Sequence, residues 1–150
     1  MNEIELKLAS RFKRLLGAII DSSIAMAVVV PVVIEMGLFE SLSKGLPLSL
    51  EQRVLLFCLG WGTFLLFNGY LLVQRGQTIG KLVVKTKIVD LKGNLVGLGK
   101  LLPLRYLALG MVSQLPFVGG LVGLLNVLMI FGSNRRCLHD YLAGTVVVDA

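Results

Sequence analysis

Long apolar stretches alternate with charged segments along the chain. Two of these stretches, 15–39 and 53–74, are long enough for helices that cross a bilayer. Two shorter ones, 99–115 and 117–132, are separated at Pro116. A glycine pair follows this proline closely, and such a sequence is typical of a helix break. The pattern predicts an all-α transmembrane fold, a bundle of four helical segments in which the short third and fourth either cross the membrane or are re-entrant.

A different pattern occurs in the charged segment 75–98. Valine, isoleucine and threonine alternate there with lysines, and Lys92-Gly93-Asn94 favours a turn, so we expect a short β-hairpin within 82–97. An isolated hairpin is marginally stable, and the β-branched stretch 144–149 is suited to be its third strand. The sequence thus predicts one domain over 1–150, with a small cytoplasmic β-element beside the helices.

The distribution of charge predicts the orientation. The chain is 55% hydrophobic and has a net charge of +6. Its basic residues gather in the segment 1–14 and in the 75–98 loop, and two arginines follow the last apolar stretch, whereas the 40–52 loop is almost balanced. By the positive-inside rule, both termini are expected to be cytoplasmic in a multi-pass protein of the cell (inner) membrane. Because topology accounts for the positive charge, no nucleic-acid partner is expected.

Two kinds of partner follow from this arrangement. Lys81, Lys85 and Lys87 of the basic loop are expected to contact anionic lipid headgroups. Cys58 and Gly62 form a small-xxx-small pair that permits close helix approach, and four short helices enclose little. We therefore expect a homodimer or another oligomer.

The first apolar stretch contains one carboxylate, Asp21. A charge inside a membrane helix costs about 2.5 to 3.5 kcal/mol, so Asp21 requires a partner. Arg14 lies about two turns earlier on the same helix face. Asp21 is therefore either a proton or cation site tuned by Arg14, or half of a structural ion pair with Arg105. Neutral ligands for an ion would come from Ser22, Asn68 and Asn126, and Asn68 lies at a depth where it could meet Asp21.

The tail presents His139 next to Asp140. The pair could relay protons, since an imidazole titrates near neutrality. Alternatively, Asp140 caps the following turn, or pairs with Arg14 or Arg136 and holds the tail against the first helix.

No catalytic residues, cofactor or metal are expected. The chain has one histidine, its serines lack a neighbouring base, and no carboxylate pair has metal-ligand spacing. The stretch Gly76-Gln-Thr-Ile-Gly-Lys81 also lacks the spacing of a phosphate-binding loop. We therefore expect that the protein is not an enzyme.

Three motifs in order carry a resemblance to a known family. They are Arg14-x6-Asp21, then Gly76-Gln-Thr-Ile-Gly-Lys81 with Asp90-Leu-Lys-Gly93, and then Leu138-His-Asp140 before Ala-Gly-Thr-Val-Val-Val. The chain resembles the RDD family of small prokaryotic membrane proteins, named for one arginine and two aspartates. The resemblance matches these residues to Arg14, Asp21 and Asp140, and it implies an inner-membrane protein for which transport of a ligand or ion is the usual suspicion.

Two functional hypotheses follow. In the first, the chain is an ion or small-solute transporter, or a subunit of one, in which Asp21 binds a proton or cation and Arg14 and Arg105 set the charge balance. In the second, it is a non-transporting scaffold or regulatory module that docks a partner through 75–100, and its charged residues only hold the helices together.

Overall fold

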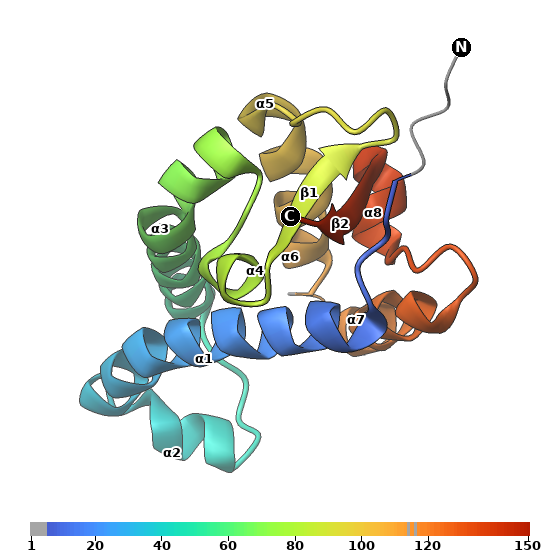
Figure 1. Ribbon diagram of the computed structural model, residues 1–150. Coiled ribbons are helices and arrows are strands. Elements are labelled where there is room, and N and C mark those ends of the chain that lie inside the picture. Colours follow the sequence, from blue (N-terminus) through green and yellow to red (C-terminus); the bar gives the residue numbers. More distant parts are fainter. Residues whose placement is uncertain (1–5, 114, 116) are drawn as a thin grey trace.

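The computed structural model describes residues 6–113, 115 and 117–150 (Figure 1). Helices make up most of the chain, and two short strands complete it. In chain order the elements are α1 (Arg11–Glu35), α2 (Leu38–Ser43), α3 (Leu50–Arg75), α4 (Ile79–Val83), β1 (Thr86–Asp90), α5 (Leu98–Lys100), the π-helical η1 (Leu101–Leu107), α6 (Ala108–Val112), α7 (Val118–Leu128), the 3-10 turn η2 (Met129–Phe131), α8 (Leu138–Ala143) and β2 (Thr145–Asp149).

Helices α1 and α3 are the two candidate membrane spans. Both are long and apolar enough to cross a bilayer, and only 11% of the residues in each apolar window are buried inside the protein. An apolar helix this exposed differs from the buried core helix of a soluble protein, and its surface suits lipid. Each helix begins at a serine cap: Ser10 accepts from the Lys13 amide, and Ser49 from the Gln52 amide, both at 3.2 Å.

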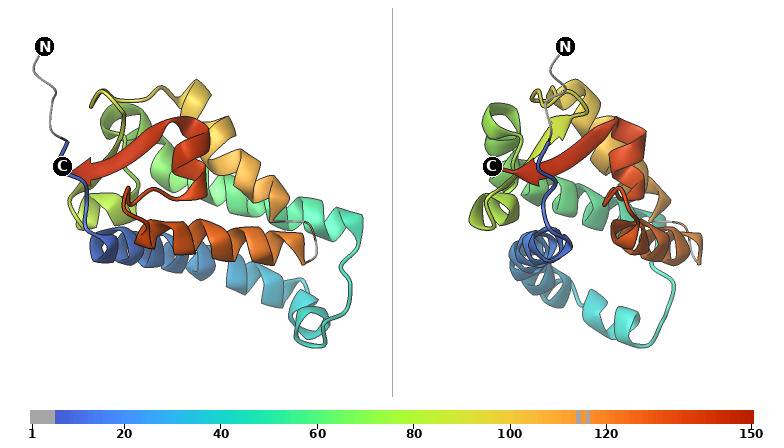
Figure 2. Two further views of the ribbon diagram at one scale, coloured as in Figure 1. Left: turned by 90° about the vertical axis from the view of Figure 1, so that its right-hand side faces the viewer. Right: turned by 45° about the vertical axis from the view of Figure 1, so that its right-hand side comes forward.

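The helical segments run back and forth between two ends of the molecule (Figure 2). The segment that leads into α1, the C-terminus, the sheet, α4 and α8 lie at one end, and α2 lies at the other. The third and fourth segments, 98–112 and 118–131, are each roughly 20 Å long, which is shorter than a hydrocarbon core of about 30 Å. Pro116, which the sequence pattern marks as the break between them, lies outside the described residues.

The expected hairpin within 82–97 is wrong. Strand β1 pairs antiparallel with the C-terminal strand β2, with Thr86 opposite Asp149, so the predicted third strand is in fact the direct partner. The other edge of β1 is hydrogen-bonded to the end of α3, where the Ile88 amide donates to the Gly76 carbonyl at 2.7 Å. The Asp90 carboxylate accepts from the Lys92 and Asn94 amides and closes a turn, so the chain does not return as a strand.

The sheet is covered on both faces by small apolar clusters. Ala9, Leu72, Ile88, Leu101 and Val147 form one buried cluster, and Val89, Val146 and Val148 form the other. The segment that leads into α1 also joins the sheet, because the Ala9 amide donates to the Val147 carbonyl at 3.0 Å. The start of α1 and the C-terminal tail are therefore fixed against each other.

Candidate functional site

Asp140 lies between two arginines at the end of the molecule that holds the sheet and the C-terminus. One of its carboxylate oxygens pairs with Arg14 of α1, and the other pairs with Arg105 of η1. Asp140 is 0% exposed and Arg105 is 3% exposed. Burial raises the pKa of Asp140, but the positive charges of Arg105 and Arg14 outweigh burial and hold that pKa well below its usual range. Asp140 is therefore an anion that joins two helical segments to the tail.

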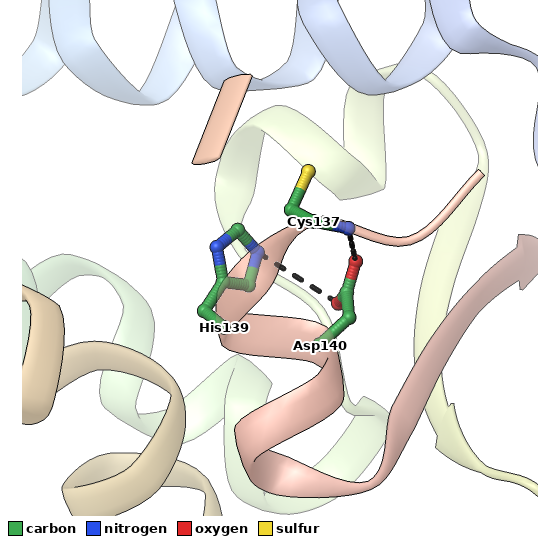
Figure 3. A group of neighbouring side chains, drawn as sticks. All are labelled: Cys137, His139 and Asp140. Carbon is green, nitrogen blue, oxygen red and sulfur yellow. Dashed lines mark hydrogen bonds and ion pairs between the residues drawn. The ribbon is translucent and has the colours of Figure 1, made fainter. Parts of the chain in front are cut away.

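Local structure fixes the position of this carboxylate. Asp140 lies in the first turn of α8 and accepts from the Cys137 amide at 2.9 Å, so it also caps the helix (Figure 3). At the other end of α8, Gly144 adopts a φ of 61° that favours glycine and turns the chain into β2. The first residue of β2, Thr145, accepts from Arg105 at 2.6 Å. The expectation that Asp140 caps its turn and binds Arg14 is confirmed.

Asp21 does not pair with Arg105, contrary to one of the two expectations for it. Its two oxygens accept from the Thr78 hydroxyl at 2.6 Å and from the Gly80 amide at 2.8 Å. Thr78 is the cap of α4, so Asp21 binds the start of that helix and holds it against α1. The described hydrogen bonds of the Arg105 guanidinium go instead to Asp140 and Thr145.

A cavity of about 490 Å³ adjoins the Arg–Asp–Arg cluster. Its walls come from α1, α7 with η2, the tail and single residues of α4, β1 and η1. Four cationic side chains line it: Arg11, Arg14, Lys81 and Arg105. Lys81 is half-buried, and burial together with the charge of Arg105 lowers its pKa to about 8. Of the three lysines expected at lipid headgroups, Lys81 thus lines the cavity, whereas Lys85 is exposed.

His139 contacts Asn126 rather than a metal. Its Nδ1 lies 2.8 Å from the Asn126 side-chain oxygen, and its ring lies near Asp140. Ligand atoms of Cys137, His139 and Asp140 lie within 4.8 Å of one another (Figure 3), but both carboxylate oxygens of Asp140 already bind arginines. A cation here would meet two guanidinium groups at short range, so this cluster is poorly suited to a metal.

The environment of His139 predicts a pH dependence of stability. Burial and the nearby charge of Arg105 lower its pKa to about 3, whereas an unfolded histidine titrates near about 6.5. The unfolded chain therefore binds the proton first, and stability falls as the pH decreases below about 6.5. Between pH 6.5 and 4.5 we expect a loss of about 1 to 2 kcal/mol in thermal unfolding in detergent. His139→Gln should flatten this slope, and an equal slope in both proteins would contradict the assignment.

The remaining predicted site residues have separate roles. Asn68 accepts from the Ile79 amide at 2.8 Å and so supports α4, next to but not on Asp21. Ser22, predicted as a neutral ligand for an ion at Asp21, is exposed on α1 and points about 100° away from Asp21 around the helix axis. Thr78, Arg11 and Thr86 belong to the site but were not predicted from the sequence. For Thr78 a signal was available, because a threonine directly before an apolar residue is typical of the cap of a helix.

Comparisons with known proteins identify the family. No curated protein and no solved structure matches the chain. The model of the RDD family matches residues 8–144, which include the two long apolar helices and the Arg14, Asp21 and Asp140 positions. This match confirms the resemblance seen in the three ordered motifs and, with the exposed apolar helices, supports a membrane protein. The chain belongs to the RDD family.

Proposed function

We propose that the protein is a membrane transporter, or a subunit of one, whose binding centre is the basic cavity beside Asp140. The observation that carries this proposal is the set of four cationic side chains around a cavity of about 490 Å³. Neither Asp21 nor Asp140 lines this cavity, and both carboxylates are bound to protein groups. The solute is therefore an anion, and the geometry does not favour a proton or cation held by Asp21.

The charge distribution supports an orientation for this transporter. The cavity lies at the end that carries the start of α1, the C-terminus, the sheet and the basic segment after α3. By the positive-inside rule this end faces the cytoplasm of a cell whose inner membrane holds α1 and α3. The third and fourth segments are too short to span a bilayer as straight helices, so we propose that they are re-entrant.

Flux in proteoliposomes tests the proposal. Asp21→Asn keeps one oxygen that can accept from the Gly80 amide, and its amide nitrogen can donate to the Thr78 hydroxyl, so α4 and Lys81 should stay in place. We expect uptake of phosphate-bearing probes, inorganic phosphate and hexyl phosphate, by the wild type, and retention of more than about half of that uptake in Asp21→Asn. Sodium or proton flux that disappears in Asp21→Asn would contradict the proposal. A wild-type protein that takes up neither anionic probe would also contradict it.

A specific observation favours a second function, a non-transporting scaffold. Asp21, Arg14 and Asp140 all make contacts that hold helices and tail together, as that hypothesis requires. The scaffold would bind a partner through residues 75–100. It predicts that Asp21→Asn lowers the melting temperature while no probe moves, and that a partner co-purifies with the wild type but not with a protein whose exposed lysines in this segment are neutralised.

An oligomer also remains part of the proposal. Cys58 is exposed on α3, and a Cβ placed on Gly62 would meet no atom within 4 Å. This open face of small residues is suited to close approach of a second copy. We expect a homodimer in detergent, measured by light scattering, and its loss in Gly62→Leu.

A further inference from the structure

We propose that the basic cavity binds an anionic amphiphile of the bilayer, with a phosphate head against Arg14, Lys81 and Arg105 and its hydrocarbon chain between α1 and α7. The inference names a substrate class for the proposed transporter, and it rests on the cavity as the binding centre. It does not require that transport occurs. It differs from general attraction of lipid to surface lysines because it assigns the lipid to one cavity.

The charge of the cavity wall is not compensated. Arg14 and Arg105 share the single charge of Asp140. Arg11 donates to the carbonyls of Ile130 and Phe131 in η2, and the Lys81 ammonium lies 3.4 Å from the Thr78 hydroxyl. Neither Arg11 nor Lys81 forms an ion pair within the part of the chain that the structure describes. A phosphate, which guanidinium and ammonium groups bind by charge-assisted hydrogen bonds, would supply the missing negative charge.

Two polar atoms of cavity residues provide an independent indication of a ligand. The Thr86 hydroxyl and the Arg105 Nε are buried, and among the described residues they have no hydrogen-bond partner. Thr86 is fully buried, and both residues line the cavity. Buried polar groups are almost always paired, because an unpaired one costs about 1 to 3 kcal/mol. Oxygen atoms of a bound head group are suitable partners for these two residues.

The apolar part of the cavity distinguishes an amphiphile from a small inorganic anion. Phe12 and Leu15 of α1, and Val127 and Phe131 of α7 and η2, line it together with Ile130. Phe12 is 72% exposed and Phe131 is 62% exposed, so the apolar lining continues into the outer surface of the helices. A volume of about 490 Å³ lies within the usual range of about 300 to 1,000 Å³ for organic ligands. Inorganic phosphate would leave most of it unfilled.

Lys81 is the position that tests the site without breaking the fold. Arg14 and Arg105 bind the buried Asp140, so their removal could unfold the protein. Lys81 has no carboxylate partner among the described residues, and Lys81→Gln removes one charge from the cavity. Lys85→Gln is the matched control, because it removes the same charge from an exposed position four residues later.

The experiment measures binding to the full chain in non-ionic detergent. The probes are dihexanoyl phosphatidylglycerol, dihexanoyl phosphatidylcholine and inorganic phosphate, with native mass spectrometry for stoichiometry and a thermal-shift titration for affinity. We expect one phosphatidylglycerol per chain, bound about tenfold more tightly than phosphatidylcholine. Lys81→Gln should raise its Kd about fivefold to tenfold, whereas Lys85→Gln should change it by less than about twofold.

Three results would overturn the inference. Equal affinity for the two lipids would show that charge does not select the ligand. Equal effects of Lys81→Gln and Lys85→Gln would show surface attraction only. Inorganic phosphate bound as tightly as phosphatidylglycerol would show a small-anion site. The proposed transport of anions would then remain, without a lipid as the ligand. Conversely, selective lipid binding without uptake of any probe would support this inference and refute the transporter.

Discussion

Asp140→Asn is expected to destabilise the protein more than any other conservative substitution, by about 3 to 5 kcal/mol. The substitution leaves Arg14 and Arg105 without their shared anion, and Arg105 is buried. A buried positive charge that loses its partner keeps its desolvation cost and gains nothing in return. The free energy of unfolding in mixed detergent micelles measures the effect.

Asp149→Asn is the matched control. Asp149 also has two cationic partners, with Lys13 at 2.7 Å and Lys7 at 3.8 Å, but these ion pairs lie at the surface. Exposed pairs contribute at most about 1 kcal/mol, so this variant should remain close to the wild type. If Asp140→Asn and Asp149→Asn lower the free energy of unfolding by the same amount, the buried arrangement of Asp140 is not what stabilises the tail.

Gly80→Ala is expected to produce the second largest effect, a loss of about 3 kcal/mol. A Cβ at this position would overlap with the carbonyl oxygen of Gly17 on α1 and would approach Asp21 Cγ to 2.9 Å. Both obstacles are fixed, one being backbone and the other a hydrogen-bonded carboxylate, so α4 must move away from α1. That movement also breaks the bond between the Gly80 amide and Asp21. Thermal unfolding in detergent measures the loss.

Gly60→Ala supplies the comparison for a helical glycine without a close neighbour. A Cβ there meets no atom within 4 Å, and alanine favours a helix over glycine by up to about 1 kcal/mol. The melting temperature of this variant should therefore stay the same or rise. A similar loss in both variants would mean that helix propensity, and not the contact between α1 and α4, determines the result.

The long elements could be predicted from the sequence because their signals are local. Apolar length alone indicates α1 and α3, and the β-branched composition of 144–149 indicates β2. The strand pairing could not be predicted in the same way. The turn residues at 92–94 favoured a hairpin, whereas β1 is occupied by β2 on one edge and contacted by Gly76 on the other. Contacts between residues far apart in sequence determine which segments pair with β1.

The candidate site shows the same division. The requirement that charges inside a membrane segment find partners pointed to Asp21 and Arg105, and the position of Asp140 in the tail predicted a cap or an ion pair with Arg14 or Arg136. It could not assign the partners, because a carboxylate is satisfied equally by a guanidinium or by a hydroxyl and an amide. The short helix α4, which supplies Thr78 and Gly80 to Asp21, leaves Arg105 for Asp140. Lys81 was predicted to be a surface lysine for a similar reason. Its position depends on the direction of α4, and that direction depends on Asp21.

Two parallel double-mutant cycles in thermal unfolding test most directly whether Arg105 belongs to Asp140 and not to Asp21. One cycle combines Asp140→Asn with Arg105→Gln, and the other combines Asp21→Asn with Arg105→Gln. The structure predicts a coupling of about 2 kcal/mol in the first cycle and less than about 0.5 kcal/mol in the second. A strong coupling between Asp21 and Arg105, with none between Asp140 and Arg105, would contradict the arrangement on which the basic cavity depends.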